Sequence, residues 1–439
     1  MELPKNDSLM EAVSSLAKRK GFVYQGSEVY GGLAGTWDYG PLGVALKNNI
    51  KDAWRKKFIS SRNDMYEVDA AILMNPKVWE ASGHVAGFSD PLVECTKCKR
   101  RFREDQLKVK GTCDDCGSSV GPARQFNMMF KTQIGAVEDS SATVYLRPET
   151  AQGVFVNFKN IVDSFHPKLP FGIAQIGKAF RNEITPRDFI FRVREFEQME
   201  IEYFIREADW EKYFEYWKDS LSEFIEELGL DMNRMHELEV EGEDRAHYSK
   251  RTIDFEFDYP FGRKELFGLA YRGSFDLSNH KLEYIDEEAK EKITPHCIEP
   301  SMGVDRLVLA LLLSAYAEDE QNGEKRSYLK FKPSMAPVIC AVSPLLKNKP
   351  ELVEVAELIH GQLKAEFGRV AYDDNGNIGK RYRRQDEIGT PWCIVVDFDT
   401  LSEENPDLRD TVTIRDRDTG EQTRVHKDEL INYIKERLS

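Results

Sequence analysis

The sequence has no apolar run of the ~18 residues or more that a membrane span needs, so we expect no transmembrane helix. Its first residues, MELPKNDSLMEAVSSLAKRK, also lack the apolar core of a secretory signal, which favours a cytoplasmic protein. Positive charge is in deficit, because the formal net charge is −15. This balance argues against a nonspecific polyanion binder, although a local basic surface can still bind one specifically. Without repeats or low-complexity tracts, the 439 residues should form about two or three domains.

Cysteine is scarce, and four of the seven cysteines form two pairs of identical spacing. Two residues separate Cys95 from Cys98 and Cys113 from Cys116, and fourteen residues lie between the pairs. This is the spacing of a four-thiolate tetrahedral zinc site. A redox pair is the alternative, but it would not need the second CxxC. Because four protein ligands leave no open coordination position, we expect a structural zinc in a small knob over residues 93–122.

Residues 176–203, IGKAFRNEITPRDFIFRVREFEQMEIEY, contain two segments of alternating polarity around a turn-like TPRD. This pattern predicts an antiparallel hairpin. Since side chains alternate between the faces of a strand, Arg181 and Glu183 should share one face of the first strand. On the second strand a single face should carry Arg192, Arg194, Phe196, Gln198 and Glu200. Two interpretations are open for this hairpin, a binding surface and a solvated face laced with salt bridges.

Pro41 opens a predicted helix in which Leu46, Ile50, Trp54 and Phe58 recur every four residues. The four side chains form one continuous apolar stripe. Such a stripe usually belongs to the core of its own chain, and a dimer contact is the alternative.

Charged residues interrupt several apolar segments. Glu149, in RPET, lies where a strand gives way to a helix, a place where a carboxylate can simply favour the helix dipole. Glu265 and Arg272 interrupt the strand patterns of residues 252–278, so they are either exposed on one face or paired in a site. Arg306 lies early in an almost wholly apolar helix, for which Ser301 is the candidate cap. An unpaired buried guanidinium is costly, so Arg306 must meet carboxylates or a bound anion.

The C-terminal part alternates strand and helix patterns after a linker-like segment at residues 330–334. This alternation predicts a compact α/β domain with a mostly parallel sheet. A basic turn within it, IGKRYRRQDEIG, surrounds Tyr382 with Lys380, Arg381, Arg383 and Arg384. The mixture of cations and an aromatic ring suits single-stranded nucleic acid, and a solvated helix face is the alternative.

Three passages together resemble the three motifs of class II aminoacyl-tRNA synthetases. GPLG at 40–43 with its long helix resembles the first motif, FRNE at 180–183 with RVREF at 192–196 the second, and GVDR at 303–306 the third. Within that class the chain is similar to the dimeric glycyl-tRNA synthetases nearly end to end. WDYGPLG, ASGH, LRPETAQG, FRNEITPR, RVREFEQMEIE and EPSMGVDR carry this resemblance.

The resemblance implies an α+β fold: a class II antiparallel sheet with flanking helices, an inserted zinc knob and a C-terminal α/β anticodon-binding domain. The expected domains are a first catalytic part at 1–92, the zinc insertion at 93–122, a second catalytic part at 123–332 with a helical insertion at about 207–250, and the anticodon-binding domain at 333–439. A homodimer is also implied.

The resemblance further implies that the protein activates glycine with ATP and then passes it to the terminal adenosine of tRNA(Gly). Arg181 would bridge the glycine carboxylate and the α-phosphate, and Arg306 would hold the γ-phosphate. Phe196 would stack on adenine while Glu183 reads its amino group, and Arg192 would support the phosphates. Glu265 would be a ligand of the Mg²⁺ that accompanies ATP. The basic turn, with Lys380, Arg381, Arg383 and Arg384, would contact tRNA.

Glycine has no side chain to grip, so the resemblance implies that its ammonium is held by several carboxylates. Glu149, Glu200 and Glu299 are the residues carried over, with Ser301 crowding the α-hydrogens and Arg272 as a counter-charge. A catalytically inactive relative that serves as a nucleic-acid-binding accessory protein is the second hypothesis. The sequence favours the ligase, because both motif arginines and all three glutamates are present.

Overall fold

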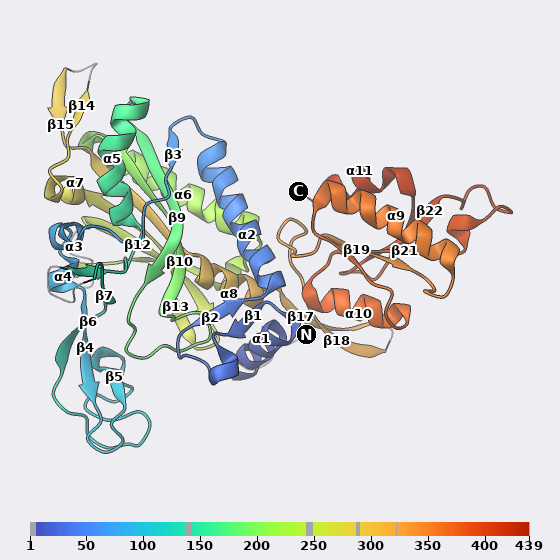
Figure 1. The fold of residues 1–439 in the computed structure, drawn as a ribbon, viewed down its shortest axis with the longest axis horizontal. Coiled ribbons are helices and arrows are strands. Elements are labelled where there is room, and N and C mark those ends of the chain that lie inside the picture. Colours follow the sequence, from blue (N-terminus) through green and yellow to red (C-terminus); the bar gives the residue numbers. More distant parts are fainter. Residues whose placement is uncertain (1–5, 137–141, 243–248, 287–289, 322, 439) are drawn as a thin grey trace.

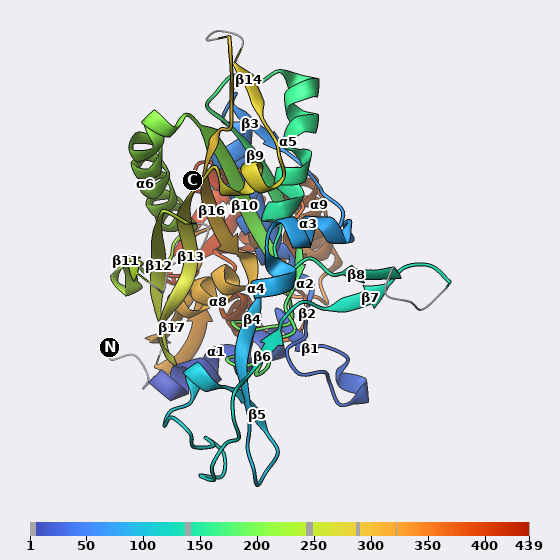
Figure 2. The same cartoon turned by 90° about the vertical axis from the view of Figure 1, so that its left-hand side faces the viewer.

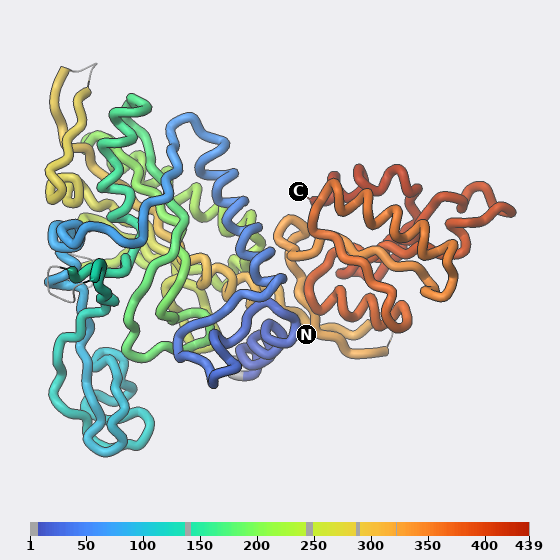
Figure 3. Tube along the Cα trace, in the orientation of Figure 1, coloured from blue at the N-terminus to red at the C-terminus, as the bar shows by residue number. Residues whose placement is uncertain are grey.

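The computed structural model describes residues 6–136, 142–242, 249–286, 290–321 and 323–438. A larger N-terminal unit and a smaller C-terminal unit lie side by side (Figure 1). Phe331, Met335 and Ala336 still pack in the core of the larger unit, and Ile339 begins the core of the smaller one. The chain therefore passes between the units just after residue 336 (Figure 3). Within the described ranges no helix is long and apolar enough to span a membrane.

A seven-stranded sheet forms the centre of the larger unit, in the order β11-β12-β13-β16-β10-β9-β3. Every neighbouring pair is antiparallel except β3 and β9, so the predicted antiparallel sheet is confirmed with one parallel edge. The strands are β3 (Met65–Glu67), β9 (Phe171–Phe180), β10 (Glu195–Ile205), β11 (Met235–Glu239), β12 (Arg251–Tyr259), β13 (Gly262–Gly273) and β16 (His296–Gly303).

Helices cover both faces of this sheet. The cluster on one face includes α1 (Asn6–Lys20), α2 (Pro41–Arg55), α6 (Trp210–Leu228) and α8 (Val304–Ala315). On the other face α5 (Ala151–Phe165) packs against β9 and β10. Figure 2 shows α5 and α6 on opposite sides of the strands. The apolar stripe of Leu46, Ile50, Trp54 and Phe58 is at most 1% exposed, so it is core of its own chain and the alternative of a dimer contact is wrong for it.

The predicted hairpin is present, but its strands are shorter than the alternation suggested. β9 ends at Phe180 and β10 begins at Glu195, so Arg181, Glu183, Arg192 and Arg194 lie on the connecting loop. Because these four residues do not belong to a strand, the alternation of faces along a strand does not predict where their side chains point.

The residues between β9 and β10 explain why this segment is a loop and not a continuation of the two strands. Pro186 cannot donate a backbone hydrogen bond, and Asp188 and Phe189 have positive φ angles of 61° and 58°. A continuous ladder of backbone hydrogen bonds between the two strands cannot pass through these residues. Only the segment from Phe196 to Glu200 follows the predicted alternation.

The passage from β16 into α8 also differs from the prediction. Ser301 lies inside β16 and caps no helix, and Gly303 precedes the first helical residue, Val304. Arg306 therefore occupies the first turn, where its side chain is 27% exposed rather than buried. The apolar part of the helix begins one residue later, at Leu307.

A knob projects from the larger unit below the sheet (Figure 2). It contains a small sheet of β5 (Arg101–Arg103), β4 (Ser89–Glu94) and β6 (Arg124–Asn127), and it carries the four paired cysteines.

The remaining α-helices and strands of the larger unit are β1 (Val23–Gln25), β2 (Trp37–Tyr39), α3 (Pro76–Ala81), α4 (His84–Gly87), β7 (Lys131–Gln133), β8 (Thr143–Tyr145), α7 (Phe275–Asn279), β14 (Tyr284–Asp286), β15 (Glu291–Ile293), β17 (Tyr316–Gln321) and β18 (Glu324–Leu329).

The smaller unit has a five-stranded sheet in the order β20-β19-β21-β22-β23. Its elements are β19 (Cys340–Pro344), α9 (Pro350–Phe367), β20 (Val370–Tyr372), α10 (Ile378–Ile388), β21 (Trp392–Val396), β22 (Thr411–Asp416), β23 (Gln422–His426) and α11 (Leu430–Lys435). The sheet is not mostly parallel, because two of its four pairings are antiparallel. The sequence prediction missed β23, which follows β22 through a tight turn with Gly420 at φ 73° and needs no crossover helix.

The basic turn of the prediction is the helix α10. Asn377 caps it, since its side chain accepts a hydrogen bond from the Lys380 backbone N–H at 2.9 Å. The segment is thus a helix rather than a turn, and its contact with nucleic acid stays a prediction.

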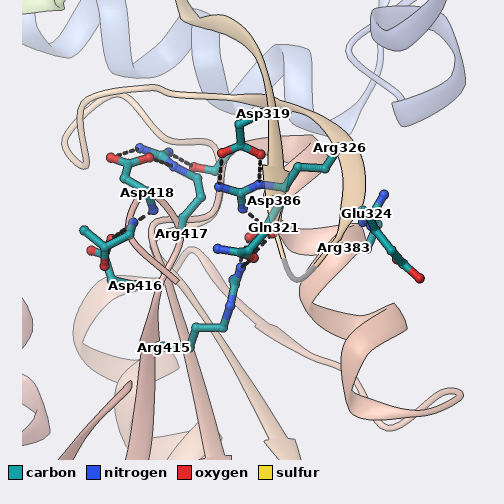
Figure 4. A network of polar contacts seen from close by, with 12 residues as sticks. Asp319, Gln321, Glu324, Arg326, Arg383, Asp386, Arg415, Asp416, Arg417 and Asp418 are labelled. Atoms are coloured by element: carbon teal, nitrogen blue, oxygen red, sulfur yellow. Dashed lines mark hydrogen bonds and ion pairs between the residues drawn. The ribbon is translucent and has the colours of Figure 1, made fainter. Parts of the chain in front are cut away.

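A network of charges joins α10 to the β17–β18 hairpin of the larger unit (Figure 4). Asp386 on α10 accepts hydrogen bonds from Arg326 Nη1 at 2.7 Å and from Arg415 Nη1 at 2.8 Å. Arg326 also binds both oxygens of Asp319, at 2.6 and 2.8 Å. This network fixes the smaller unit to the strands that follow α8.

Candidate active site

A cavity of about 460 Å³ opens on the α5 side of the central sheet. Every residue that the sequence predicted for ATP or glycine lines it, with the exception of Arg272. The lining residues from that prediction are Glu149, Arg181, Glu183, Arg192, Phe196, Glu200, Glu265, Glu299, Ser301 and Arg306. They come from the RPET junction before α5, the β9–β10 loop and the strands β10, β13 and β16, and from the first turn of α8.

Guanidinium groups occupy the outer part of the cavity. The Arg181 guanidinium carbon lies 5.2 Å from the ring centroid of Phe196 and 5.4 Å from that of Phe88, and its Nε donates to the Pro148 carbonyl at 3.1 Å. These contacts hold the planar group. Within the part of the chain that the structure describes, its Nη1 and Nη2 make no hydrogen bond, so they can receive an anion.

Arg306 and Arg192 are each placed beside a carboxylate of the cavity wall. Arg306 Nη1 lies 3.1 Å from Glu265 Oε2, and its guanidinium carbon is 4.5 Å from the ring centroid of Phe191. Arg192 Nη1 is 3.7 Å from Glu183 Oε2. The predicted condition for Arg306 is met, since it contacts a carboxylate.

Three glutamates form the floor of the cavity. Glu200 Oε1 accepts hydrogen bonds from Ser301 Oγ at 2.6 Å and from Gln198 Nε2 at 3.2 Å, and its Oε2 accepts one from Thr150 Oγ1. Glu149 lies 3.2 Å from His84 Nε2 and accepts a bond from Gln152 Nε2, also at 3.2 Å. The three are 3–8% exposed. We call Glu149, Glu200 and Glu299 the glutamate floor.

Arg272 lies behind the glutamate floor and not in the cavity lining. It is 2% exposed, and its Nε and Nη2 donate to the two oxygens of Asp276 at 2.7 and 2.8 Å. Its Nη1 donates to Glu299 Oε2 at 2.5 Å. Arg272 is therefore a counter-charge of Glu299 and orients that carboxyl through a charge-assisted hydrogen bond.

The electrostatics of the floor reflect an excess of acid. Burial, helped by the charge of neighbouring Glu149, raises the pKa of Glu200. Burial also raises the pKa of Glu299 to about 8, although Arg272 opposes the shift. For Glu149 burial acts in the same direction, but His84 and Arg272 outweigh it and lower the pKa. A bound cation would relieve the mutual repulsion of these groups.

Sequence reasoning assigned no role to two residues at the cavity. Arg103, on β5 of the knob, lines the cavity and is held by Asp90 Oδ2 at 2.7 Å and Asp105 Oδ2 at 2.8 Å. His84, in the ASGH motif, steadies Glu149 and is itself 2.8 Å from Ser82 Oγ. ASGH was among the motifs of the resemblance, whereas nothing local distinguished Arg103 from the other cations near the cysteines.

The four paired cysteines converge as predicted. All four sulfur atoms lie within 4.8 Å of one another, with Cys95 and Cys116 at 3.5 Å and Cys98 and Cys113 at 3.6 Å. Zinc–sulfur bonds of ~2.3 Å in a tetrahedron separate the sulfurs by roughly 3.8 Å, so these four donors fit a zinc ion. The knob also contacts the β9–β10 loop, where Arg187 Nη2 donates to Gln106 Oε1 at 3.1 Å.

The basic residues predicted to contact tRNA lie apart from the cavity, on α10. Arg381 is 3% exposed and donates to the carbonyls of Pro344, Asp374 and Gly376, so it holds the start of the helix and presents no free cation. Lys380 is exposed. Arg383 binds Glu324 at 2.9 Å, and Arg384 binds Asp373 at 2.8 Å.

Comparisons with known proteins agree with this architecture. Residues 130–316 match the family model of the tRNA synthetase class II core domain (G, H, P, S and T), and residues 339–437 match that of the anticodon binding domain. The chain is 48% identical to a glycine–tRNA ligase of Caldanaerobacter subterraneus, with 98% of both chains covered. It is 47% identical to the glycine–tRNA ligase of Clostridium acetobutylicum (99% and 100% covered) and 49% identical to that of Borreliella burgdorferi (97% of both). This chain therefore belongs to the glycine–tRNA ligase family of class II synthetases.

Proposed function

We propose that this protein joins glycine to ATP in the cavity, giving glycyl-adenylate and pyrophosphate. It then transfers the glycyl group from the adenylate to the 3′-terminal adenosine of tRNA(Gly), and AMP leaves. The observation that carries this proposal is the pairing, in one cavity, of an outer set of guanidinium groups with a floor of acidic groups. ATP, a polyanion, and the glycine carboxylate would meet the guanidinium groups, and the glycine ammonium would meet the acidic groups.

The first step needs two anions to approach each other. The glycine carboxylate attacks the α-phosphorus, the bond to the bridging oxygen breaks, and pyrophosphate leaves with its electron pair. A carboxylate is already a nucleophile, so the protein must supply positive charge rather than a general base. Arg181, whose guanidinium lies over the rings of Phe88 and Phe196, would bridge the carboxylate and the α-phosphate. Arg306 would hold the γ-phosphate, with Arg192 supporting the phosphate chain.

The adenine base would lie on Phe196. Its ring already carries the Arg181 guanidinium at 5.2 Å, so base and guanidinium would be stacked close to the reacting phosphate. Glu183, which is 9% exposed and has an oxygen without a hydrogen-bond partner among the described residues, would accept a bond from the adenine amino group. That bond would complete the hydrogen bonding of a buried carboxylate.

The glycine ammonium would be held by the glutamate floor, with Arg272 fixing Glu299 from behind. Ser301 donates to Glu200 at 2.6 Å, so with the ammonium on Glu200 its hydroxyl would crowd the α-hydrogens of glycine. Larger amino acids would clash there, and exclusion by size is far easier than exclusion of a smaller substrate.

Two metals fit the donor groups. Carboxylate oxygens suit Mg²⁺, and Glu265 faces the cavity close to Asp254, whose pKa is raised to about 7 by burial and by the charge of Glu265. When bound with ATP, Mg²⁺ supplies shielding of the triphosphate charge. The four thiols suit a structural Zn²⁺, which would hold the knob and with it Arg103 at the cavity.

Further proposals concern partners and organisation. Lys380, Arg383 and Arg384 on α10 would contact tRNA, a proposal that the match to the anticodon binding domain supports. Arg381 is left out because it is buried. The catalytic parts would span residues 1–92 and 123–332 and the anticodon-binding part residues 333–439, and the shift between cores after residue 336 supports the second boundary. Part of the helical insertion at about 207–250 lies outside the described residues.

The protein would act as a cytoplasmic homodimer. Val29 and Tyr30, beside the first motif, are 90% and 91% exposed, and these apolar side chains suit a surface that a second copy covers. Sedimentation of the purified protein would measure the mass, and Tyr30→Glu should shift it toward the monomer.

The decisive assay is glycine-dependent exchange of labelled pyrophosphate into ATP with pure protein and Mg²⁺. We expect exchange with glycine and none without it. No exchange, with tRNA binding retained, would favour the inactive accessory protein instead.

A further inference from the structure

A second layer of acid lies directly behind the glutamate floor. Glu202 follows Glu200 by two residues on β10, so both side chains point to the same face of the sheet. β10 and β16 pair Glu200 with Ser301 and Tyr203 with Ile298, a register that brings Glu202 opposite Glu299. Glu202 is 0% exposed and does not line the cavity, and the mechanism proposed above does not use it.

The two carboxyl oxygens of Glu202 differ in their contacts, and this difference fits a protonated acid. Its Oε2 accepts from Cys297 Sγ at 2.8 Å, while its Oε1 receives no hydrogen bond from any residue that the structure describes. Directly opposite residues of an antiparallel pair have Cβ atoms about 4.5–5.5 Å apart, so the buried carboxyl groups of Glu202 and Glu299 are close enough to share a hydrogen bond. Two carboxyl groups in such contact cannot both be ionised, so a proton must lie between them.

The charged and titratable groups around Glu202 show which partner keeps that proton. Glu299 and Cys297 face it from β16, Arg272 from β13 and Glu200 from its own strand. Glu299 receives the Arg272 guanidinium at 2.5 Å and borders the place of the substrate ammonium, whereas Glu202 borders no such place. Burial and the charge of Glu299 raise the pKa of Glu202 well above its ordinary value, in agreement with the geometry.

We propose that Glu202 is a protonated positioning residue, whose carboxyl O–H donates a hydrogen bond to Glu299 and thereby holds the ionised Glu299 toward the glycine ammonium. The proton stays on Glu202 throughout. The O–H and the Arg272 N–H then fix Glu299 from two directions. The floor and the layer behind it together carry one negative charge fewer than their number of acids suggests. This inference rests on the proposed function for its kinetic test but not for its spectroscopic one.

Substitution by glutamine distinguishes a protonated from an ionised Glu202. In Glu202→Gln the amide oxygen can accept from Cys297 and the NH₂ can donate to Glu299, which is the pattern of the protonated acid. Glu202→Ala removes the donor. Glu200→Gln is the matched control, because Glu200 lies two residues away on the same face. Among the described residues both of its oxygens accept hydrogen bonds, from Thr150, Ser301 and Gln198.

The kinetic test measures KM for glycine and for ATP by pyrophosphate exchange. We expect Glu202→Gln to change KM for glycine less than about threefold, because no hydrogen bond is lost. Glu202→Ala should raise it by about tenfold or more, the cost of a hydrogen bond to a charged group, while KM for ATP stays within about twofold. Glu200→Gln should raise KM for glycine at least as much as Glu202→Ala. If Glu202→Gln behaves like Glu200→Gln, Glu202 is ionised and the proposal is overturned.

The spectroscopic test needs no substrate. Above the pKa of about 8 for Glu299, the wild-type infrared spectrum should contain the carbonyl stretch of a protonated carboxylic acid that the Glu202→Gln spectrum lacks. Absence of a difference band would overturn the proposal even if both proteins catalyse exchange. A wild-type protein that shows the band but no exchange would instead contradict the proposed function alone. If Glu202→Ala does not fold, the glutamine variant and the band still decide the question.

Discussion

Two buried charge clusters in this protein differ in one respect, their balance. Around Asp386 the cations Arg326 and Arg415 face the anions Asp386 and Asp319, and every charge has a partner of opposite sign within 3 Å (Figure 4). Behind and within the floor of the cavity, the acids Glu149, Glu200, Glu202, Glu299 and Asp276 surround the guanidinium of Arg272. The first cluster is complete in itself. The second lacks a cation, and a substrate ammonium supplies one.

The comparison teaches that net charge, rather than burial, separates a structural cluster from a binding one. Most members of both clusters are buried, although the Asp319 side chain is 30% exposed, and both clusters use carboxylates with bidentate arginine. Removing one partner of a balanced pair strands a charge, whereas removing one acid from an excess relieves repulsion. Variants of the two clusters should therefore have opposite effects on stability and on substrate use.

The largest effect on stability should come from Asp386→Ala. It strands Arg415 and leaves Arg326 with Asp319 alone, and breaking a buried pair costs about 3–5 kcal/mol. The free energy of unfolding, measured in urea, should fall by that order while KM for glycine stays unchanged. Glu324→Ala is the control, since its partner Arg383 is 36% exposed and such pairs contribute about 1 kcal/mol or less. A similar loss for both variants would show that the Asp386 network has no special role.

The next effect concerns Glu200→Ala in the glutamate floor. It removes one partner of the ammonium, so kcat/KM for glycine should fall by about 10²-fold or more, whereas KM for ATP should barely change. Its thermal midpoint should not fall below that of the wild type by as much as in Asp386→Ala, because the floor has acid in excess. Equal losses in the use of glycine and ATP would remove Glu200 from the ammonium site.

A smaller effect follows from the pKa of about 8 for Glu299. Below this pH the free protein holds a proton on Glu299 that must leave before an ammonium can bind, so KM for glycine should fall as the pH rises from 6.5 to 8 and level off above it. KM for glycine should change by at most about tenfold per pH unit. Glu299→Gln should abolish the slope, and a wild-type KM that is independent of pH over this range would contradict the assignment. KM for ATP serves as the internal control.

The smallest expected effect is that of zinc removal. The thiolates of Cys95, Cys98, Cys113 and Cys116 are another anionic cluster that needs a cation. Chelation should increase hydrogen exchange over residues 93–122 and raise KM for ATP a few-fold through Arg103, without unfolding the central sheet. If the whole protein melts in a single step at a lower temperature after chelation, the knob is part of the main cooperative unit.

Much of this fold follows from local patterns. Alternation predicted the pairing of β9 with β10 and the common face of Phe196, Gln198 and Glu200, because each strand is long and one face is buried. The stripe on α2 and the spacing of the cysteines were equally direct signals. In each case the information lies within a few residues of chain.

The features that local patterns did not predict depend on strand register and on partners that are distant in the sequence. Arg181 and Arg192 were placed on strands because alternation continues past the point where Pro186 and its neighbours break the ladder. Arg381 looks like its exposed neighbours in sequence, and only the three carbonyls that it meets show it to be structural. Glu202 is indistinguishable from Glu200 by pattern, because its distinction is the identity of the residue across the strand, Glu299.

The central claim is that the glutamate floor recognises the substrate by its ammonium. Glycolate has the carboxylate and nearly the size of glycine but a hydroxyl in place of the ammonium, so it tests this claim directly in the pyrophosphate exchange assay. We predict that kcat/KM for glycolate is lower than that for glycine by about 10²-fold or more, because the buried carboxylates would be left without their cation. Equal exchange with the two acids would contradict the account.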